Sequence, residues 1–298
     1  MSERFATVGE ITLCYEAFGD PADPTVLLIM GLGTQMLGWP DQFCVELAGR
    51  GFHVVRYDNR DCGRSTQVEG RPPTAVQLLV RSKRAAVYSL DDMADDGVGL
   101  LDQLGVDAAH VVGASMGGMI AQVLAARRPA RVRSVVSIMS STGHRFTGQP
   151  ALGLLPIFLR RAPRAREAWV DHTAEVFRLI GSPGFERDEE EFRDVLRRSW
   201  ERGHDAAGTG RQLAAIIAAG DRTSQVAQVR APTLVIHGGA DRLVSPSGGR
   251  RTAETVRGAQ LLVIEGMGHD LPRGTWPRNI AGIVENAARA GEPTPAVG

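Results

Sequence analysis

The chain has 298 residues, of which 43 % are hydrophobic, enough to bury the core of one large domain or two modest ones. Its 34 basic and 34 acidic side chains give zero formal net charge, which argues against nucleic acid or an anionic membrane as the main partner, because both favour an excess of basic residues. The first residues lack the apolar core of a signal peptide, and no stretch approaches the roughly 20 apolar residues of a membrane span. Cys14, Cys44 and Cys62 fit neither a disulfide framework nor a zinc site. We therefore expect a globular cytoplasmic protein.

The first part of the chain alternates between short apolar runs and helical patterns, from Ile11 to about Ser141. The apolar runs are continuous, as expected of strands buried on both faces, and cover residues 26–30, 53–58, 110–113 and 132–139. The helical patterns between them cover residues 42–50, 91–104 and 117–128. Strands that alternate with helices imply a parallel sheet with right-handed crossovers, so we predict an α/β fold.

The pattern changes near Ser141 and then returns. From residue 142 to about residue 227 there is no buried-strand run, and apolar residues recur at helical spacing among charged ones. Two later apolar runs, residues 233–238 and 261–265, are again typical of buried strands. We therefore predict one α/β core domain from residues 1–141 and 228–290, with a mostly parallel central sheet flanked by helices. Residues 142–227 are predicted to form a helical cap domain inserted between two strands, and the proline-containing residues 291–298 a disordered tail.

A G-x-S-x-G pentapeptide occupies residues 113–117. It directly follows a predicted strand and directly precedes a predicted helix, which is the strand–turn–helix setting of a nucleophile elbow. The two glycines allow the helix to approach the strand closely, so that a strained turn lifts the Ser115 hydroxyl above the sheet. Ser115 is therefore the predicted nucleophile, with an ordinary Gly-Ser turn as the alternative.

A serine at its free pKa is a poor nucleophile, so we expect an acid and a histidine to follow it in the chain. Of the seven histidines, His269 alone lies in a glycine-flanked loop just beyond a late strand, where an open α/β sheet builds its site. Asp241 follows the predicted strand 233–238 at the same edge. We predict His269 as the general base and Asp241 as the acid that orients it, with a turn cap as the alternative role of Asp241. His237 lies inside that strand and is expected to be a satisfied core residue.

The oxyanion of the reaction requires two backbone N–H donors. The residue after the nucleophile, Met116, supplies the first. Leu32 is the natural second donor, because it lies between Gly31 and Gly33 in the loop after the first buried strand. These two amides are the predicted oxyanion hole.

Two further groups of residues receive supporting roles. The polar turn formers of residues 57–65 are predicted to be structural, with Asp58 and either Arg60 or Arg64 tying this loop beside the site. Apolar residues of the predicted cap are candidates for the pocket wall, with the core of the cap as the alternative: Leu152, Leu154, Leu155, Ile157, Phe158 and Trp169. The candidates for the pocket floor are Met36, Leu37, Trp39 and Met116.

Together these motifs resemble the α/β-hydrolase fold superfamily with a cap domain, in its serine-nucleophile branch, from Ile11 to about Ala287. Within that superfamily the chain is similar to the aclacinomycin methylesterase group, whose members hydrolyse a carboxylic methyl ester on an aromatic polyketide. The motifs that carry this similarity are residues 19–24, 38–40, 56–65 and 266–269. Cofactor-free haloperoxidases, enol-lactonases and small-ester carboxylesterases share most of them.

The chain departs from these families at two positions. Many relatives have His-Gly in the oxyanion loop, whereas here Met30 precedes Gly31, and Asp61 stands where many relatives carry glycine, a feature shared with the methylesterase group. Dehalogenases and epoxide hydrolases of this fold use an aspartate nucleophile, so Ser115 argues against both.

The sequence thus predicts a serine hydrolase that cleaves a carboxylic ester of a small or medium apolar substrate through an acyl-enzyme. Within enzymes, the alternatives are a lactonase of the enol-lactone type and a cofactor-free perhydrolase or haloperoxidase. A non-catalytic ligand receptor on the same fold is the alternative of another class. We expect no cofactor, no metal, no nucleic-acid or membrane partner, and either a monomer or a homodimer.

Overall fold

The computed structural model describes residues 2–74, 76–77, 80, 82–154 and 163–291. In these residues eight strands form one sheet, in the order β1-β2-β4-β3-β5-β6-β7-β8. The strands are β1 Arg4–Val8, β2 Ile11–Phe18, β3 Thr25–Ile29, β4 His53–Tyr57, β5 Ala109–Ala114, β6 Val132–Ile138, β7 Thr233–Gly238 and β8 Gln260–Ile264. Every pairing from β4 to β8 is parallel, whereas β2 pairs antiparallel with both β1 and β4. The predicted α/β fold with a mostly parallel sheet is confirmed.

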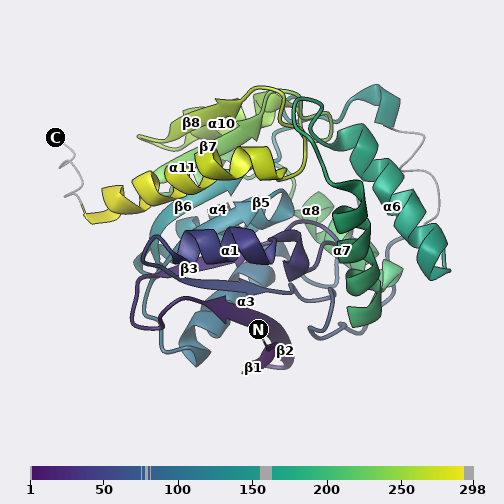
Figure 1. Cartoon of the computed structure of the whole chain (residues 1–298), viewed down its shortest axis with the longest axis horizontal. Helices are drawn as coiled ribbons and strands as arrows, with labels where there is room; N and C mark the ends of the chain where they lie inside the picture. The colour runs from purple at the N-terminus through teal and green to yellow at the C-terminus, as the bar shows by residue number, and fades with distance from the viewer. Residues whose placement is uncertain (1, 75, 78–79, 81, 155–162, 292–298) are drawn as a thin grey trace.

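Helices cover both faces of this sheet, because its central strands are apolar on both sides. Every residue of β3, β4, β5 and β7 is buried. One core cluster joins the sheet to α3 and α4, and the other joins it to α1 and α11, which lie on the same face in Figure 1. The flanking helices are α1 Asp41–Ala48, α3 Leu90–Gln103, α4 Met116–Arg127, α10 Pro246–Thr255 and α11 Trp276–Ala288. Short 3-10 helices occur at Met36–Gly38, Lys83–Ala85, Pro129–Arg131, Leu152–Leu154, Arg273–Thr275 and Arg289–Gly291.

The β1–β2 hairpin lies ahead of the first predicted strand and is an addition to the sequence-based prediction. Its outer strand is half exposed, and the Phe5 side chain faces solvent. An edge strand of this kind has no continuous apolar run, so the pattern used to predict the central strands does not detect it.

Between β6 and β7 the described residues form helices and no strand. These helices are α6 Arg166–Ile180, α7 Glu189–Arg202, α8 Ala206–Ala219 and α9 Thr223–Val226. Figure 1 shows α6 and α7 standing beside one end of the sheet. Val170, Ala174 and Leu196 form a small apolar cluster between α6 and α7, separate from the two clusters that involve the sheet. Residues 155–162 of the predicted cap and 292–298 of the predicted tail lie outside the described residues.

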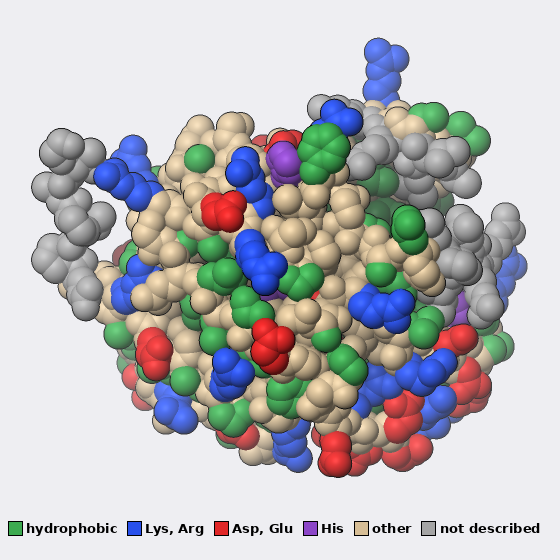
Figure 2. All heavy atoms as spheres, turned by 90° about the horizontal axis from the view of Figure 1, so that it is seen from above, with side chains coloured by type: hydrophobic (Ala, Val, Ile, Leu, Met, Phe, Trp, Pro, Cys, Tyr) green, Lys and Arg blue, Asp and Glu red, His purple; other side chains and the backbone are tan. Residues whose placement is uncertain are grey.

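Charged side chains of both signs are interspersed on the face seen in Figure 2, which agrees with the zero formal net charge. Among the described residues, no helix combines the length and the apolar character needed to cross a bilayer.

Candidate active site

Ser115 occupies a sharp turn between β5 and α4 with φ of +57°. This left-handed region is unfavourable for a residue that carries a Cβ, and such strain is typical of functional turns. Gly113 and Gly117 make the turn possible: a Cβ at Gly113 would lie 2.0 Å from the Gly117 carbonyl oxygen, and a Cβ at Gly117 would lie 2.1 Å from that of Ile29. Because both contacts are with backbone, neither can relax. The strand–turn–helix predicted for residues 113–117 is present.

The three side chains predicted as nucleophile, base and acid form one hydrogen-bonded chain. His269 Nε2 lies 2.9 Å from Ser115 Oγ, and His269 Nδ1 lies 2.8 Å from Asp241 Oδ2. The backbone N–H groups of Leu243 and Val244 both donate to Asp241 Oδ1 at 2.9 Å. Because an ionised carboxylate only accepts hydrogen bonds, the proton of the imidazole is on Nδ1 and its Nε2 lone pair faces the serine hydroxyl. This arrangement can remove a proton from Ser115.

These three residues come from the carboxyl ends of three parallel strands. Ser115 follows β5 directly, Asp241 lies in the loop after β7, and His269 lies in the loop after β8. His269 and Asp241 are buried, and Ser115 is partly exposed. The sheet therefore gathers residues that are far apart in the sequence at one edge, as parallel α/β sheets generally do.

The two segments that carry the predicted oxyanion donors both lie against the nucleophile. Met116 is the first residue of α4, where a backbone N–H has no partner within the helix and forms part of the positive end of the helix dipole. The loop that carries Leu32 is packed against the serine, because a Cβ at Gly31 would lie 3.0 Å from Ser115 Cβ. The structure thus brings the Leu32 loop and the Met116 amide to the same serine.

The loop after β4 holds the site together, as predicted for Asp58. Asp58 accepts hydrogen bonds from the backbone N–H groups of Met36 and Arg64, at 2.8 Å and 3.0 Å. The side chains of the two arginines turn elsewhere: that of Arg60 pairs with Asp96 on α3, and that of Arg64 pairs with Glu3. Asp58 therefore ties the loop after β4 to the segment that follows the Leu32 loop.

Two arginines of the inserted helices were missed by sequence reasoning. Arg202 at the end of α7 lies 2.7 Å from the carboxylate of Asp58, and Arg211 on α8 lies 2.7 Å from that of Asp61. Both pairs are buried. Asp61 has φ of +64°, a backbone conformation that glycine adopts most easily. The unusual aspartate was the available sequence signal, but its partner lies 150 positions away in an arginine-rich segment.

The inserted segment also contacts the loop of His269. The His269 N–H donates to the Ile180 carbonyl oxygen at 2.7 Å, and the Gly268 N–H donates to Ser182 Oγ at 2.8 Å. The Ser182 hydroxyl in turn donates to Asp270. Burial raises the pKa of Asp270 above its usual value, although the hydrogen bonds from Ser182 act in the opposite direction. The end of α6 and Ser182 therefore hold the backbone N–H groups of Gly268 and His269 and the side chain of Asp270.

His237 was expected to be a core residue with all its hydrogen bonds made, and this expectation is wrong for one of its two ring nitrogens. Its Nε2 donates to the Val244 carbonyl oxygen at 2.8 Å and lies 3.5 Å from Asp241 Oδ2. Its Nδ1 is buried and has no hydrogen-bond partner among the described residues. Burial lowers the pKa of His237, so the ring is neutral at neutral pH. His237 thus lies beside the predicted acid as well as in the core.

The predicted pocket residues take different positions. The prediction of Trp39 as a pocket residue was wrong. Trp39 is fully buried in the core cluster of α1 and α11 and packs against Phe43. The sequence alone does not tell whether an apolar side chain lines a pocket or lies in the core. Met36, Leu37 and Leu154 are buried, and Leu152 is 82 % exposed. Trp169 packs against Trp200 and His204 within the inserted helices. Leu155, Ile157 and Phe158 lie outside the described residues.

The cysteines do not compete with Ser115 as nucleophiles. All three are free and buried. Burial raises the pKa of Cys14 and of Cys44 to about 12 and that of Cys62 well above its usual value, so each is a thiol at neutral pH. Among the described residues, no group of three His, Cys, Asp or Glu side chains is placed to hold a metal ion.

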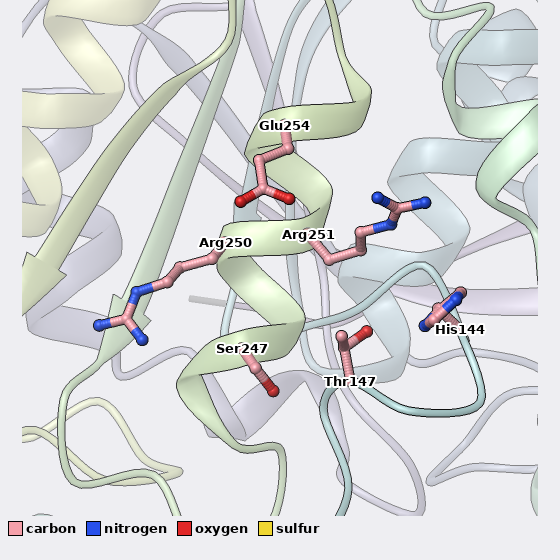
Figure 3. Close-up of a pocket in the computed structure, with 6 residues that line it drawn as sticks. All are labelled: His144, Thr147, Ser247, Arg250, Arg251 and Glu254. Carbon is pink, nitrogen blue, oxygen red and sulfur yellow. The ribbon is translucent and has the colours of Figure 1, made fainter.

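A separate surface pocket of about 320 Å³ lies between α10 and the segment after β6 (Figure 3). None of its lining residues is a predicted site residue. They are His144, Thr147, Ser247, Arg250, Arg251 and Glu254. Arg250 points away from His144 and Thr147 in Figure 3, so the basic side chains of this pocket do not converge.

Comparison with known proteins agrees with this geometry. The sequence pattern of the alpha/beta hydrolase fold family matches residues 24–272. Rhodomycin D methylesterase DauP of Streptomyces sp. (strain C5) is 30 % identical, over 91 % of this chain and 93 % of its own length. The 3-oxoadipate enol-lactonase 2 of Acinetobacter baylyi is 26 % identical over 87 % of each chain. The crystal structure of a hydrolase from Pseudomonas aeruginosa PA01 superposes with a TM-score of 0.71 at 24 % identity, covering 96 % of this chain and 98 % of that one.

Proposed function

Because the chain belongs to the alpha/beta hydrolase fold family, we propose that it is a serine hydrolase that cleaves a carboxylic ester of a small or medium apolar substrate. The observation that carries the proposal is the hydrogen-bonded chain from Ser115 through His269 to Asp241. The similarity to a methylesterase makes methyl esters the first substrates to test.

The first step forms an acyl-enzyme. Ser115 Oγ attacks the ester carbonyl carbon while His269 Nε2 takes the hydroxyl proton, and the carbonyl π electrons move to the oxygen. Asp241 stays ionised and stabilises the imidazolium through Nδ1–H. The backbone N–H groups of Leu32 and Met116 hold the oxyanion. Collapse of this intermediate breaks the bond to the alcohol, which leaves with the proton from His269.

The second step releases the acid. A water molecule gives its proton to His269 Nε2 and attacks the acyl carbon, and the same two amides hold the second oxyanion. When this intermediate collapses, Ser115 Oγ leaves and regains its proton from His269. Each step uses only groups of the chain and one water molecule.

The inserted residues 142–227 are proposed to act as the cap over this site. Their contacts with the Leu32 loop, the loop after β4 and the His269 loop support this role. Met36 and Leu154 remain proposed pocket residues, since neither belongs to the core cluster that contains Trp39 or to the other two apolar clusters of the described residues.

The experiment that tests the proposal compares the wild type with Ser115→Ala on methyl, p-nitrophenyl and lactone substrates. We expect Ser115→Ala to lose at least about a thousandfold in kcat, as removal of a triad nucleophile does, while keeping the wild-type circular dichroism spectrum and Tm. Ser247→Ala, in the separate surface pocket, is the matched control and should keep full activity. A fluorophosphonate should label Ser115 in the folded wild type. Undiminished activity of Ser115→Ala, or a folded wild type that the probe does not label, would contradict the proposal.

A lactone is the second candidate substrate, because the chain is 26 % identical to an enol-lactonase over most of its length. The same acyl-enzyme chemistry applies, with the leaving alcohol still tethered to the acyl group. Faster turnover of lactones than of open-chain esters in the same panel would select this alternative.

A further inference from the structure

Helix α8 packs directly against the loop that carries the proposed oxyanion donor Leu32. Gly33 has φ of +63°, and a Cβ there would lie 2.8 Å from Thr209 Oγ1 on α8. At the neighbouring position of α8, a Cβ at Gly208 would lie 2.4 Å from the Asp61 carbonyl oxygen. These two close approaches place α8 on the loop after β3 and on the loop after β4 at once.

At this contact the side chain of Gln212 uses both ends of its amide. Its Oε1 accepts a hydrogen bond from the Gly33 N–H at 2.8 Å, and its Nε2 donates to the Arg60 carbonyl oxygen at 2.8 Å. Gln212 is 0 % exposed, so water does not compete for either bond. A buried amide with both partners made holds the two backbone groups at a fixed separation.

Together with the backbone, the hydrogen bonds close a ring that includes Leu32. At the other end of the loop, Asn59 Nδ2 donates to the Met30 carbonyl oxygen at 2.9 Å. Asn59 directly precedes Arg60 in the chain, and the Arg60 carbonyl oxygen accepts the hydrogen bond from Gln212 Nε2. The segment from Met30 to Gly33 is therefore held at both ends by one short stretch of the loop after β4, directly at Met30 and through Gln212 at Gly33.

The loop needs such a clamp because of its composition. Leu32 lies between Gly31 and Gly33, and glycine has the widest choice of backbone conformations. The Gly33 N–H belongs to the peptide unit that follows Leu32, so fixing its direction removes the rotation of that unit. A loop with two glycines and no clamp would sample orientations in which the Leu32 N–H does not reach the oxyanion.

We propose that Gln212 is a positioning residue for the Ser115 reaction, which aims the Leu32 N–H at the oxyanion by holding the Gly33 peptide. This inference rests on the proposed function. Because the oxyanion exists only in the transition state and the tetrahedral intermediates, loss of the clamp lowers kcat and leaves KM nearly unchanged.

The test compares Gln212→Met with the wild type and with Gln122→Met. Methionine is close to glutamine in size but makes neither hydrogen bond. Gln122 is likewise buried and hydrogen-bonded, to Ser137 and Arg222, and its partners are not those of the oxyanion loop. We expect Gln212→Met to lower kcat by about 10- to 100-fold, less than the 10²- to 10³-fold typical of a deleted oxyanion donor, with KM within about threefold. Labelling of Ser115 by a fluorophosphonate should slow by a similar factor, and Gln122→Met should match the wild type in both measurements.

Hydrogen exchange separates this inference from its premise, and a second variant adds a conservative comparison. Hydrogen exchange at the Gly33 amide should become faster in Gln212→Met but not in Gln122→Met, whether or not the protein hydrolyses an ester. Gln212→Glu keeps an oxygen that accepts the Gly33 N–H, so its kcat should exceed that of Gln212→Met, and this variant also serves if Gln212→Met does not fold.

Three outcomes would overturn the role of Gln212. Gln212→Met could keep the wild-type kcat and labelling rate, or it could change KM alone. Gln212→Met and Gln122→Met could also lose kcat equally. An inactive wild type that does not react with the probe would instead overturn the proposed function.

Discussion

The guanidinium of Arg211 on α8 lies 2.7 Å from the carboxylate of Asp61, and the two side chains are only 5 % and 0 % exposed. The pair joins the inserted helices to the loop after β4, and the Tyr88 hydroxyl adds a third group by donating to Asp61 at 2.7 Å. A buried ion pair contributes little net stability compared with apolar packing, but losing one partner leaves the other charge buried and unpaired. The attachment of α8 to the core therefore depends on both members of this pair.

Replacement of Arg211 by methionine should lower the free energy of unfolding by about 3–5 kcal/mol, because Asp61 is left as an uncompensated buried carboxylate. Urea denaturation measures this loss. Arg128→Met is the matched control: Arg128 pairs with Asp95, but both side chains are more than 40 % exposed, so the expected loss is below about 1 kcal/mol. Similar losses for the two variants would show that burial of the Arg211–Asp61 pair does not matter.

Replacement of Asp241 by asparagine should reduce kcat by about 10³- to 10⁴-fold in ester hydrolysis. The amide has no charge to stabilise the imidazolium, and its N–H₂ group favours the tautomer with the proton on His269 Nε2, which cannot accept the serine proton. Steady-state kinetics with a methyl ester measures the effect, and Tm shows whether the fold is kept. A loss below about tenfold in a folded variant would assign Asp241 the role of a turn cap.

Acid should destabilise the fold in part through His110. Burial lowers the pKa of His110 to about 4, with Arg133 contributing, whereas its value in the unfolded chain is about 6.5. Between these two values the unfolded chain binds a proton that the folded protein does not, so stability falls as the pH decreases through this window. The linkage amounts to about 2 kcal/mol at pH 5.

The variant that isolates this contribution is His110→Asn, whose side chain can still reach Ser134, the partner of His110 Nδ1. Urea unfolding at pH 7.5 and at pH 5 should show a smaller drop in stability for His110→Asn than for the wild type. Some pH dependence should remain, because burial also lowers the pKa of His53 and of His237. An unchanged drop would mean that His110 titrates normally.

Thiol reagents should leave the folded protein active. The three cysteines are buried, and burial raises their pKa values, so little thiolate is available to react. Titration with an aromatic disulfide reagent at pH 8 should find almost no reactive thiol in the folded protein and three in urea. Rapid inactivation under native conditions would contradict this prediction and would require a reactive cysteine at or near the site.

Much of the fold and of the candidate site follows from local patterns. Continuous apolar runs mark β3, β5 and β7 because strands covered by helices on both faces leave no polar side to the sequence. The run of β8 marks a strand as well, although β8 lies at the edge of the sheet and is only partly buried. The pentapeptide around Ser115 is recognisable because a sharp turn between strand and helix tolerates only glycine at its two crowded positions. Asp241 and His269 could be chosen from the sequence because parallel strands bring their carboxyl ends to one edge.

The tertiary structure alone decided which distant groups meet. Two contacts depend on how α8 lies against the core. Arg211 pairs with Asp61, and Gln212 binds the loop of Leu32. Such partners leave no periodic signal, because the sequence of α8 does not show which of its polar side chains packing will bury against the core. The same holds for Trp39, whose apolar side chain suits a pocket or a core equally well. The sequence by itself determined the local elements and the residue types of the predicted triad. The contacts that support these residues are set by long-range packing, because burial decides whether a polar side chain has a structural role.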